Sequence, residues 1–299
     1  MDRTTKTGAL GRKAIKETVF FSLPAILLIL LTIYIPFVLS AVYSFTEWNG
    51  ISKAARYIGL DNFKQIFTGN PDFLNALVFT GKYAFFFIIL SNVFALALAV
   101  ALTRKFGLAN FLRGMYFIPY IMSMTIVGFI WKFIFTQGFD QLYTLTKWNI
   151  WNLSWLGNSS LAFWSVLIVG VWQSLGFYIV LYIAGLQAVP TDVYEAAAID
   201  GANSVQRFFR VVLPLLGPSI TTCVFMSLTN SLKVFDIILA LTKGGPGGAT
   251  YSATLEIYRE AFQNNHYGLG SAKAILFFFI VLLLTQVVLK IFEHREVEM

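Results

Sequence analysis

Six long apolar segments follow one another along the chain, separated by polar stretches that carry most of the charged residues. A helix that spans the hydrocarbon core of a bilayer needs about 20 apolar residues. The candidate spans are Val19–Phe45, Tyr83–Thr103, Gly114–Phe135, Leu161–Gln187, Val211–Leu241 and Ala274–Leu289. The pattern predicts an all-α integral membrane protein with six transmembrane helices.

The first and last spans each raise a question of interpretation. Basic residues precede the first span, as in a secretory signal, but the chain is uncharged from Thr18 to Thr46, which is too long for such a signal. We therefore expect this segment to be a retained span. The last span has only 16 uncharged residues, so we expect Lys273 and Lys290 to extend to the two membrane interfaces.

The composition agrees with a lipid environment. Hydrophobic residues make up 57% of the chain and charged residues 12%, whereas soluble domains carry about 25% charged residues. The formal net charge of +7 would also suit a nucleic-acid-binding protein. The basic residues, however, stand at the ends of apolar runs and not along one stripe, so we expect no nucleic-acid partner.

The distribution of lysine and arginine predicts an orientation. Twelve of these residues fall in the two tails and in the loops after the second and fourth spans, against six in the other loops. By the positive-inside rule, the tails 1–18 and 291–299 are then cytoplasmic, and so is the loop 190–214. Residues 19–290 form the six-span transmembrane domain.

The residue inventory offers no catalytic or metal site. Cys223 is the single cysteine, and His266 and His294 stand in separate polar segments, so no cluster of His and Cys ligands can form. The glycine-rich stretch LTKGGPGGAT at 241–250 lacks the GxxxxGK[ST] order of a nucleotide-binding loop. We expect no catalytic residue, no metal and no cofactor on this chain.

The predicted cytoplasmic loop reads as helix, sharp turn, helix. Asp192 and Glu195 have the D-x-x-E spacing of an N-terminal capping arrangement. Gly201 stands where a left-handed residue ends a helix, and either Asn203 or Ser204 can cap a second one. The same pattern also fits an amphipathic connector that lies on the membrane and has no partner.

The sequence of this loop resembles a known motif. EAAAIDGA at 195–202, followed by FFRVVLPLLGP at 208–218, is similar to the EAA motif of binding-protein-dependent ABC importer permeases. In that family the motif forms the coupling helices that dock into a groove on the ATPase subunit. The resemblance implies these ATPase-coupling residues: Glu195, Ala196, Ala197, Asp200, Gly201, Ala202, Leu213 and Pro214.

Further stretches resemble the carbohydrate-uptake branch, and within it the first permease of maltose-, glycerol-phosphate- and multiple-sugar-type importers. They are GLDNF at 59–63, LRGMYFIPYIMS at 112–123 before IW at 130–131, AGLQAVP at 184–190, LTKGGPGGAT at 241–250 and YGLGSA at 267–272. The resemblance covers about residues 19 to 290. Unlike the enteric maltose version, this chain has a short loop between its first two spans and no extra N-terminal spans, so the role of the larger extracellular insert does not carry over.

The resemblance implies a type I ABC importer permease, which is not itself an enzyme. It takes up a carbohydrate, with ATP and Mg bound by partner subunits. The implied partners are a companion permease, two ATPase subunits, an extracellular or periplasmic solute-binding protein and the lipid of a bacterial or archaeal cytoplasmic membrane. The alternatives are an importer of glycerol-3-phosphate or another small polar solute, and a secondary transporter. The latter needs membrane carboxylates, of which only Asp236 qualifies.

Polar and aromatic residues in the fourth and fifth spans form a candidate solute site, because polar groups within spans usually face a cavity or a partner. Aromatic rings suit the apolar face of a sugar, and amides and hydroxyls suit its hydroxyl groups. The candidates are Trp172, Gln173, Ser174, Phe177, Ser227, Asn230 and Ser231. Positions equivalent to Gln173, Ser174, Phe177, Ser227 and Ser231 lie at or near the sugar site in the maltose-type relatives that the chain resembles.

Several polar and aromatic positions have a structural interpretation beside the functional one. Lys233 and Asp236 are three residues apart, which would place them on one helix face as a structural ion pair. Trp172 fits helix packing as well as a solute site, and Asn92 in the second span fits a bond between helices. Residues 244–248 fit either an outer loop that meets a binding protein or an exposed turn.

Overall fold

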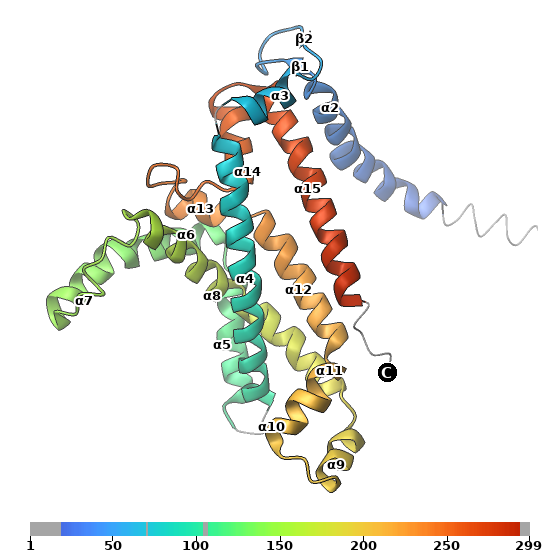
Figure 1. Ribbon diagram of the computed structural model, residues 1–299, viewed down its shortest axis with the longest axis vertical. Helices are drawn as coiled ribbons and strands as arrows, with labels where there is room; N and C mark the ends of the chain where they lie inside the picture. The colour runs from blue at the N-terminus through green and yellow to red at the C-terminus, as the bar shows by residue number, and fades with distance from the viewer. Residues whose placement is uncertain (1–18, 70, 104–106, 294–299) are drawn as a thin grey trace, which may run out of the picture. The chain divides into compact units, whose positions relative to one another are not determined.

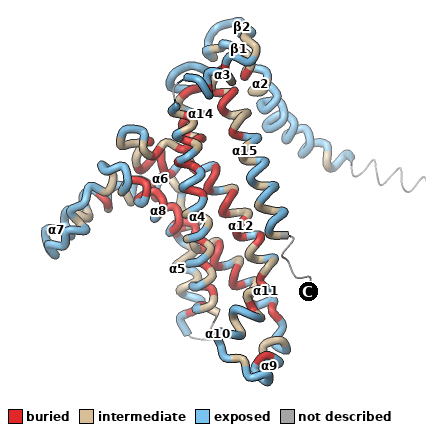
Figure 2. Tube along the Cα trace, in the orientation of Figure 1, coloured by how far each residue is buried: buried red, intermediate tan, exposed pale blue. Residues whose placement is uncertain are grey.

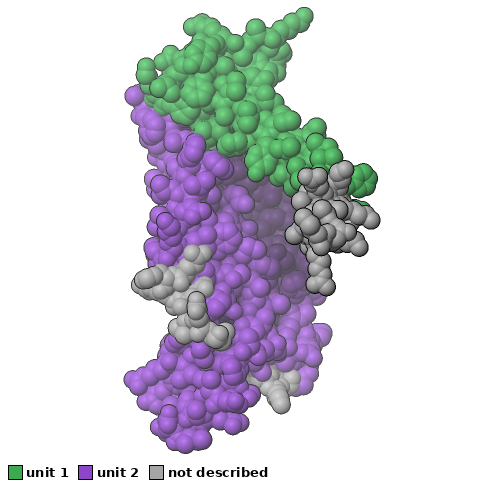
Figure 3. All heavy atoms as spheres, turned by 90° about the vertical axis from the view of Figure 1, so that its right-hand side faces the viewer, with its two compact units in different colours: residues 1–65, 260–275 green, residues 66–259, 276–299 purple. Residues whose placement is uncertain are grey.

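A computed structural model describes residues 19–69, 71–103 and 107–293 of the 299-residue chain. The chain divides into two compact units, coloured green and purple in Figure 3. Unit 1 comprises residues 1–65 and 260–275, and unit 2 comprises residues 66–259 and 276–299.

Every predicted span is mostly helical in the part of the chain that the structure describes, but the third is interrupted at residues 122–123 and the fifth at residues 233–235. Four helical segments are long and apolar enough to cross a membrane: Val19–Tyr43, α4 (Asp72–Thr103), α8 (Ser159–Ala188) and Tyr267–Phe292 within α15 (Tyr267–Glu293). Two bent helix pairs pass the same test, namely Ala109–Ile121 with Met124–Thr146, at 98°, and Ser204–Leu215 with Gly217–Leu232, at 69°. Counting each bent pair as one span gives the six that the apolar pattern predicts.

Unit 1 contains the first span and the loop that follows it. A π-helical stretch, η1 (Leu30–Tyr34), leads into α2 (Ile35–Tyr43), and a short antiparallel pair, β1 (Thr46–Glu47) and β2 (Arg56–Tyr57), follows before α3 (Asp61–Thr68). The amide of Asn62 is buried and donates to the carbonyls of Ser44 and Thr46 at 2.9 Å. This side chain therefore fixes the start of α3 against the end of α2.

Unit 2 is built around α4 and α8, with α5 packed on α8, α12 on α4 and α13 on α6. Figure 2 shows α8 with the most buried positions along its length, and α9 and α10 lie together at one end of the unit (Figure 1). Its remaining elements are α5 (Ala109–Ile121), α6 (Met124–Phe133), η2 (Ile134–Gly138), α7 (Phe139–Thr146), α9 (Thr191–Ile199), α10 (Ser204–Arg207), η3 (Phe208–Val212), α11 (Leu213–Leu215), α12 (Gly217–Leu232), α13 (Asp236–Leu241) and α14 (Ala253–Tyr258). The segment η4 (Arg259–Gln263) follows α14.

Close helix packing explains one glycine of α8. A Cβ added at Gly176 would collide with the backbone carbonyl oxygen of Tyr116 on α5. Only a residue without a side chain allows the two backbones to approach this closely. The α5–α8 contact therefore depends on this position.

Several boundaries differ from the prediction: the third span extends past Phe135 to Thr146, the fifth ends at Leu232 instead of Leu241, and the second and sixth begin earlier than predicted. The helix α4 begins at Asp72, before the predicted Tyr83, because it accommodates Lys82, whose ammonium lies 4.6 Å from the ring centre of Phe163. The helix α15 begins at Tyr267 and is not short. The expectation that Lys273 reaches an interface is wrong, since this side chain is buried and its ammonium lies 2.5 Å from the carboxylate of Glu260.

Candidate functional site

The loop 190–214 has the helix–turn–helix form that its sequence predicts. The first helix, α9, begins at Thr191, and no side chain caps it, so the predicted capping role of Asp192 is wrong. Gly201 has φ of +79°, and the amides of Gly201 and Ala202 donate to the carbonyls of Ala198 and Ala197, both at 3.1 Å. This double closure is the Schellman arrangement, which favours glycine because the residue is left-handed.

The second short helix begins with a complete capping box. The amide of Gln206 donates to the side chain of Asn203 at 2.9 Å, and the amide of Asn203 donates to the side chain of Gln206 at 3.0 Å. Of the two caps that the sequence allows, Asn203 is the one used. The chain then passes through η3 and α11 into α12 without a loop.

The predicted coupling residues differ in exposure. Glu195, Ala196, Asp200 and Gly201 are exposed, whereas Ala197 is buried within the chain. Leu213 and Ala202 are half-buried and Pro214 is exposed. Sequence reasoning overlooked Ile199, whose side chain is 86% exposed next to the turn. An apolar side chain projecting this far from a short helix offers an anchor to a partner protein.

A cavity of about 280 Å³ lies inside unit 2, between α4, α8 and the segment that joins α12 to α13. Four of the seven predicted solute-site residues line it: Gln173, Ser174, Asn230 and Ser231. Its aromatic lining, which the sequence analysis did not select, comprises Tyr83, Phe87, Tyr120 and Phe235. Tyr83 and Phe87 are one helical turn apart, and this spacing could have indicated an aromatic face on the second span.

Gln173 has a structural task as well. Its amide nitrogen donates to the carbonyl of Tyr120 at 3.2 Å and lies 3.5 Å from that of Met122. These carbonyls belong to the break where α5 ends and α6 begins. Backbone groups freed by a break at membrane depth need protein partners, because lipid supplies none.

Ser227 does not line this cavity. It is fully buried, its hydroxyl accepts a hydrogen bond from the amide of Asn92 at 3.0 Å, and the carbonyl oxygen of the Asn92 side chain accepts one from the hydroxyl of Tyr182 at 2.7 Å. This polar cluster links α4, α8 and α12. It confirms the interpretation of Asn92 as a bond between helices.

The two predicted aromatic residues of α8 also lie outside the cavity lining. The ring of Trp172 is 5.5 Å from that of Trp131 in an edge-to-face contact, which agrees with helix packing. Phe177 stacks on Tyr120 with 5.0 Å between ring centres. Since Tyr120 is part of the wall, Phe177 supports the cavity from behind.

Lys233 and Asp236 line the cavity but do not share a helix face. The helix α12 ends at Leu232 and α13 begins at Asp236, so the premise of the predicted pair is wrong. Among the residues that the structure describes, no ion pair joins them. Both side chains are exposed, and the cavity therefore carries one positive and one negative charge.

The glycine-rich loop after α13 is closed by its own hydrogen bonds. The hydroxyls of Thr242 and Thr250 lie 2.8 Å apart, and Thr250 also donates to the carbonyl of Gly245 at 2.7 Å. Gly244 has φ of +86°, and a Cβ there would collide with the ring of Tyr251. The loop thus has a defined shape, and α13 joins it directly to the cavity.

Arg259 is the central cation of an ionic cluster next to this loop. Its guanidinium lies 2.7 Å from the carboxylate of Asp72, 3.0 Å from that of Glu256 and 4.6 Å from the ring centre of Tyr251. Burial would lower the pKa of Arg259, but the hydrogen bonds to Asp72 and Tyr251 and the charge of Glu256 raise it. This side chain stays charged.

Glu260, in unit 1, is the centre of a second ionic cluster. Its carboxylate accepts from the ammonium of Lys273 at 2.5 Å, contacts the His266 ring at 2.8 Å and accepts from Asn264 at 3.3 Å. Burial raises the pKa of Glu260, but the hydrogen bonds from Lys273 and His266 outweigh this effect and lower it. This cluster was not predicted from the sequence, because its members come from η4, the loop after it and α15.

Comparison with known proteins agrees with this architecture. Residues 91–297 match the family described as "Binding-protein-dependent transport system inner membrane component". The chain is 40% identical to the probable starch degradation products transport system permease protein AmyD of Thermoanaerobacterium thermosulfurigenes, over 93% of this chain and 94% of the relative. It is 34% identical to the multiple sugar-binding transport system permease protein MsmF of Streptococcus mutans, over 93% of this chain and 95% of the relative.

The fold is similar to that of a chain in the crystal structure of a bacterial alginate ABC transporter in complex with an alginate pentasaccharide-bound periplasmic protein. The TM-score is 0.79, with 20% identity over 94% of each chain. The family match covers more than half of the chain, and the two relatives match it almost end to end. The chain therefore belongs to the binding-protein-dependent inner membrane components, the permeases of ABC transport systems.

Proposed function

We propose that this chain is one of two transmembrane permeases of an ATP-driven importer that takes up a carbohydrate delivered by an extracellular solute-binding protein. It pairs with a companion permease and with two ATPase subunits, which bind the ATP and Mg and hydrolyse the nucleotide. It lies in a bacterial or archaeal cytoplasmic membrane with both termini in the cytoplasm.

The observation that carries this proposal is the geometry of the loop 190–214. Its two short helices meet at a left-handed glycine closed by hydrogen bonds, and Glu195 and Asp200 are exposed on it. A closed turn and a capping box hold the loop in one conformation. Such a unit suits rigid docking into a groove on another protein.

The same loop connects mechanically to the cavity. Two residues separate the end of α8 from the start of α9, and η3 leads through α11 into α12. Gln173 and Ser174 belong to α8, and Asn230 and Ser231 belong to α12. When the ATPase subunits close on ATP, movement of the docked loop would shift both helices and alternate the access of the cavity.

The lining favours a neutral polyhydroxylated solute. Amides and hydroxyls alternate with aromatic rings, and the charges of Lys233 and Asp236 balance. The carbohydrates in the names of the relatives belong to the same chemical class. Uptake of glycerol-3-phosphate is the second candidate, because Lys233 offers a cation, but Asp236 opposes an anion in the same cavity.

Reconstitution with the partner subunits tests the proposal. The complex is placed in proteoliposomes, and uptake of radiolabelled maltose, raffinose and glycerol-3-phosphate is followed with ATP inside and the binding protein outside. ATP-dependent uptake of a sugar, lost in the double variant Glu195→Lys with Asp200→Lys, is the expected result. Uptake of the phosphate ester alone would select the second candidate, and uptake without ATP would refute an ATP-driven importer.

A further inference from the structure

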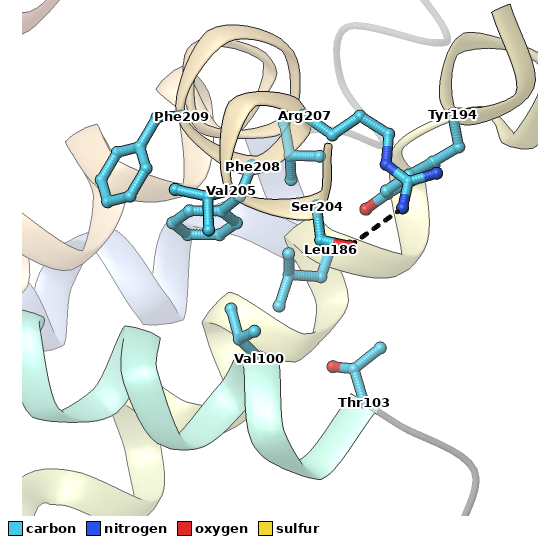
Figure 4. A pocket seen from close by; sticks show the side chains of 10 residues that line it. Val100, Thr103, Leu186, Tyr194, Ser204, Val205, Arg207, Phe208 and Phe209 are labelled. Atoms are coloured by element: carbon cyan, nitrogen blue, oxygen red, sulfur yellow. Dashed lines mark hydrogen bonds between the residues drawn. The ribbon is translucent and has the colours of Figure 1, made fainter. Parts of the chain in front are cut away.

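A cavity of about 500 Å³ lies between the loop 190–214, which we call the coupling loop, and the ends of two spans (Figure 4). Its lining contains Val100 and Thr103 from α4, Leu186 from α8, and a run of residues from α10 and η3. Several of its lining residues belong to the loop 190–214, but the proposed transport steps assign no ligand to the cavity itself. It lies entirely within unit 2.

The depth of this cavity follows from where the helices end. Thr103 is the last residue of α4, and Leu186 stands two residues before the end of α8. Both helices are long and apolar enough to span a membrane. A cavity lined by the last turns of two spans therefore lies where the hydrocarbon core gives way to the lipid headgroups.

The lining is polar at one end and apolar at the other. In Figure 4 the side chains of Arg207, Ser204 and Tyr194 gather on one side, while Phe209 and Val205 lie on the other. Val205 is 66% exposed and Phe209 is 60% exposed. A ligand that satisfies both ends has a polar head and an apolar tail.

The charge at the polar end is positive. Arg207 makes a long hydrogen bond of 3.4 Å to the hydroxyl of Ser204 and, among the described residues, has no ion pair. None of the ten lining residues is acidic. A second cation, Arg113, donates to the carbonyl of Leu102 at 2.7 Å, next to Thr103. The head of the ligand is therefore an anion.

We propose that this cavity binds an anionic glycerophospholipid, with its phosphate on Arg207 and Ser204 and one acyl chain against Val205, Phe208 and Phe209. A free phosphate would leave the apolar wall unused, and a zwitterionic lipid would bring its own cation to Arg207. Basic sites at the ends of spans bind anionic headgroups in this way. The bound lipid would hold the coupling loop against α4 and α8, so membrane composition would adjust coupling.

Native mass spectrometry tests the binding step. The complex of the full chain with its partner subunits is taken from nanodiscs that contain equal amounts of phosphatidylcholine and phosphatidylglycerol. The wild type should retain phosphatidylglycerol preferentially. Arg207→Gln should weaken this retention by about tenfold or more, the effect of one charged hydrogen bond, whereas the matched variant Arg210→Gln should not, since Arg210 does not line the cavity.

A second pair of variants tests the tail. Val205→Trp fills the cavity from its exposed side and should release the lipid although Arg207 remains. Val78→Trp adds the same ring at an exposed position of α4 that does not line the cavity and should have no effect. Equal losses in Arg207→Gln and Arg210→Gln would show general surface attraction and overturn the proposal. So would a benzophenone at Val205 that crosslinks to the ATPase or the companion permease instead of lipid, because the cavity would then be a protein interface.

Discussion

At the scale of single residues, the sequence identified polar positions in spans better than it identified their tasks. Asn92, Gln173 and Ser227 were all singled out, and all three are hydrogen-bonded within the chain. A polar side chain in a span can form hydrogen bonds with a neighbouring helix as readily as with a solute. The sequence does not show which helix is the neighbour. The distinction needed the packing of α4, α8 and α12.

The cluster around Asn92 gives a stability prediction. Asn92→Leu removes the hydrogen bonds to Ser227 and Tyr182 and should lower the free energy of unfolding by about 1–2 kcal/mol, as for other hydrogen bonds between membrane helices. Thermal unfolding in detergent measures this change. Thr222→Val, which removes an exposed hydroxyl bonded only within its own helix, is the control. Equal midpoints for both variants would contradict the linking role of Asn92.

The cluster around Glu260 gives a prediction with a defined pH dependence. Glu260→Gln removes the carboxylate that lies 2.5 Å from the buried ammonium of Lys273, and breaking this buried ion pair should destabilise the chain by about 3–5 kcal/mol at neutral pH. The double variant with Lys273→Met should recover much of this loss. Because the pKa of Glu260 is lowered on folding, its contribution is complete above its ordinary value of about 4.5 and is lost as the pH falls through the folded value. Unfolding midpoints of Glu260→Gln and wild type should therefore converge only at pH values below the ordinary pKa of a glutamate.

At the scale of helices, local rules predicted the helix–turn–helix form of the loop 190–214 but did not predict the bends. Gly201 and Asn203 were recognised because turns and caps depend on a few neighbouring residues. The 98° bend near Ser123 was not predicted, because a continuous run of apolar residues does not indicate where a helix breaks. For the 69° bend at Leu216, the flanking Pro214 and Pro218 were a visible signal.

The turn at Gly201 gives a graded prediction. Gly201→Asn should preserve ATP-coupled uptake, Gly201→Ala should reduce it moderately, and Gly201→Pro should abolish it. A Cβ at this position meets no neighbouring atom, so the effects arise from φ alone. Asparagine tolerates the left-handed region, alanine loses about 1–2 kcal/mol there and proline cannot enter it. Uptake and membrane abundance are measured together, and full activity of the proline variant would exclude the coupling assignment.

At the scale of the whole molecule, the apolar pattern predicted the fold class and the number of candidate spans. The composition and the loop motif led to the family that the comparisons then confirmed. The candidate solute cavity was only partly predicted, because its aromatic lining comes from α4, α5 and Phe235, where ring residues look like ordinary core. Any contribution from the proposed companion permease would come from another chain, which this sequence does not contain.

Orientation is open to a direct labelling test. Single cysteines at Ser204 should react with a membrane-impermeant maleimide only from the cytoplasmic side, and cysteines at Lys53 and Asn264 only from outside. All three positions are exposed. The native Cys223 is buried, so it should stay unlabelled in intact cells. Reaction at Ser204 from the outside would reverse the assigned orientation.

The hydrogen bonds of Gln173 set a rule for any solute that reaches the cavity. Its amide nitrogen has two protons, and the carbonyls of Tyr120 and Met122 lie within reach of both. The group that remains for a solute is the amide oxygen of Gln173, which can only accept a hydrogen bond. A ligand must therefore offer Gln173 a hydroxyl proton, and one that took the amide protons instead would free the carbonyls at the break between α5 and α6. For a ligand of the second kind, occupancy of the cavity and the geometry of that break would be thermodynamically linked, each changing the free energy of the other by the same amount.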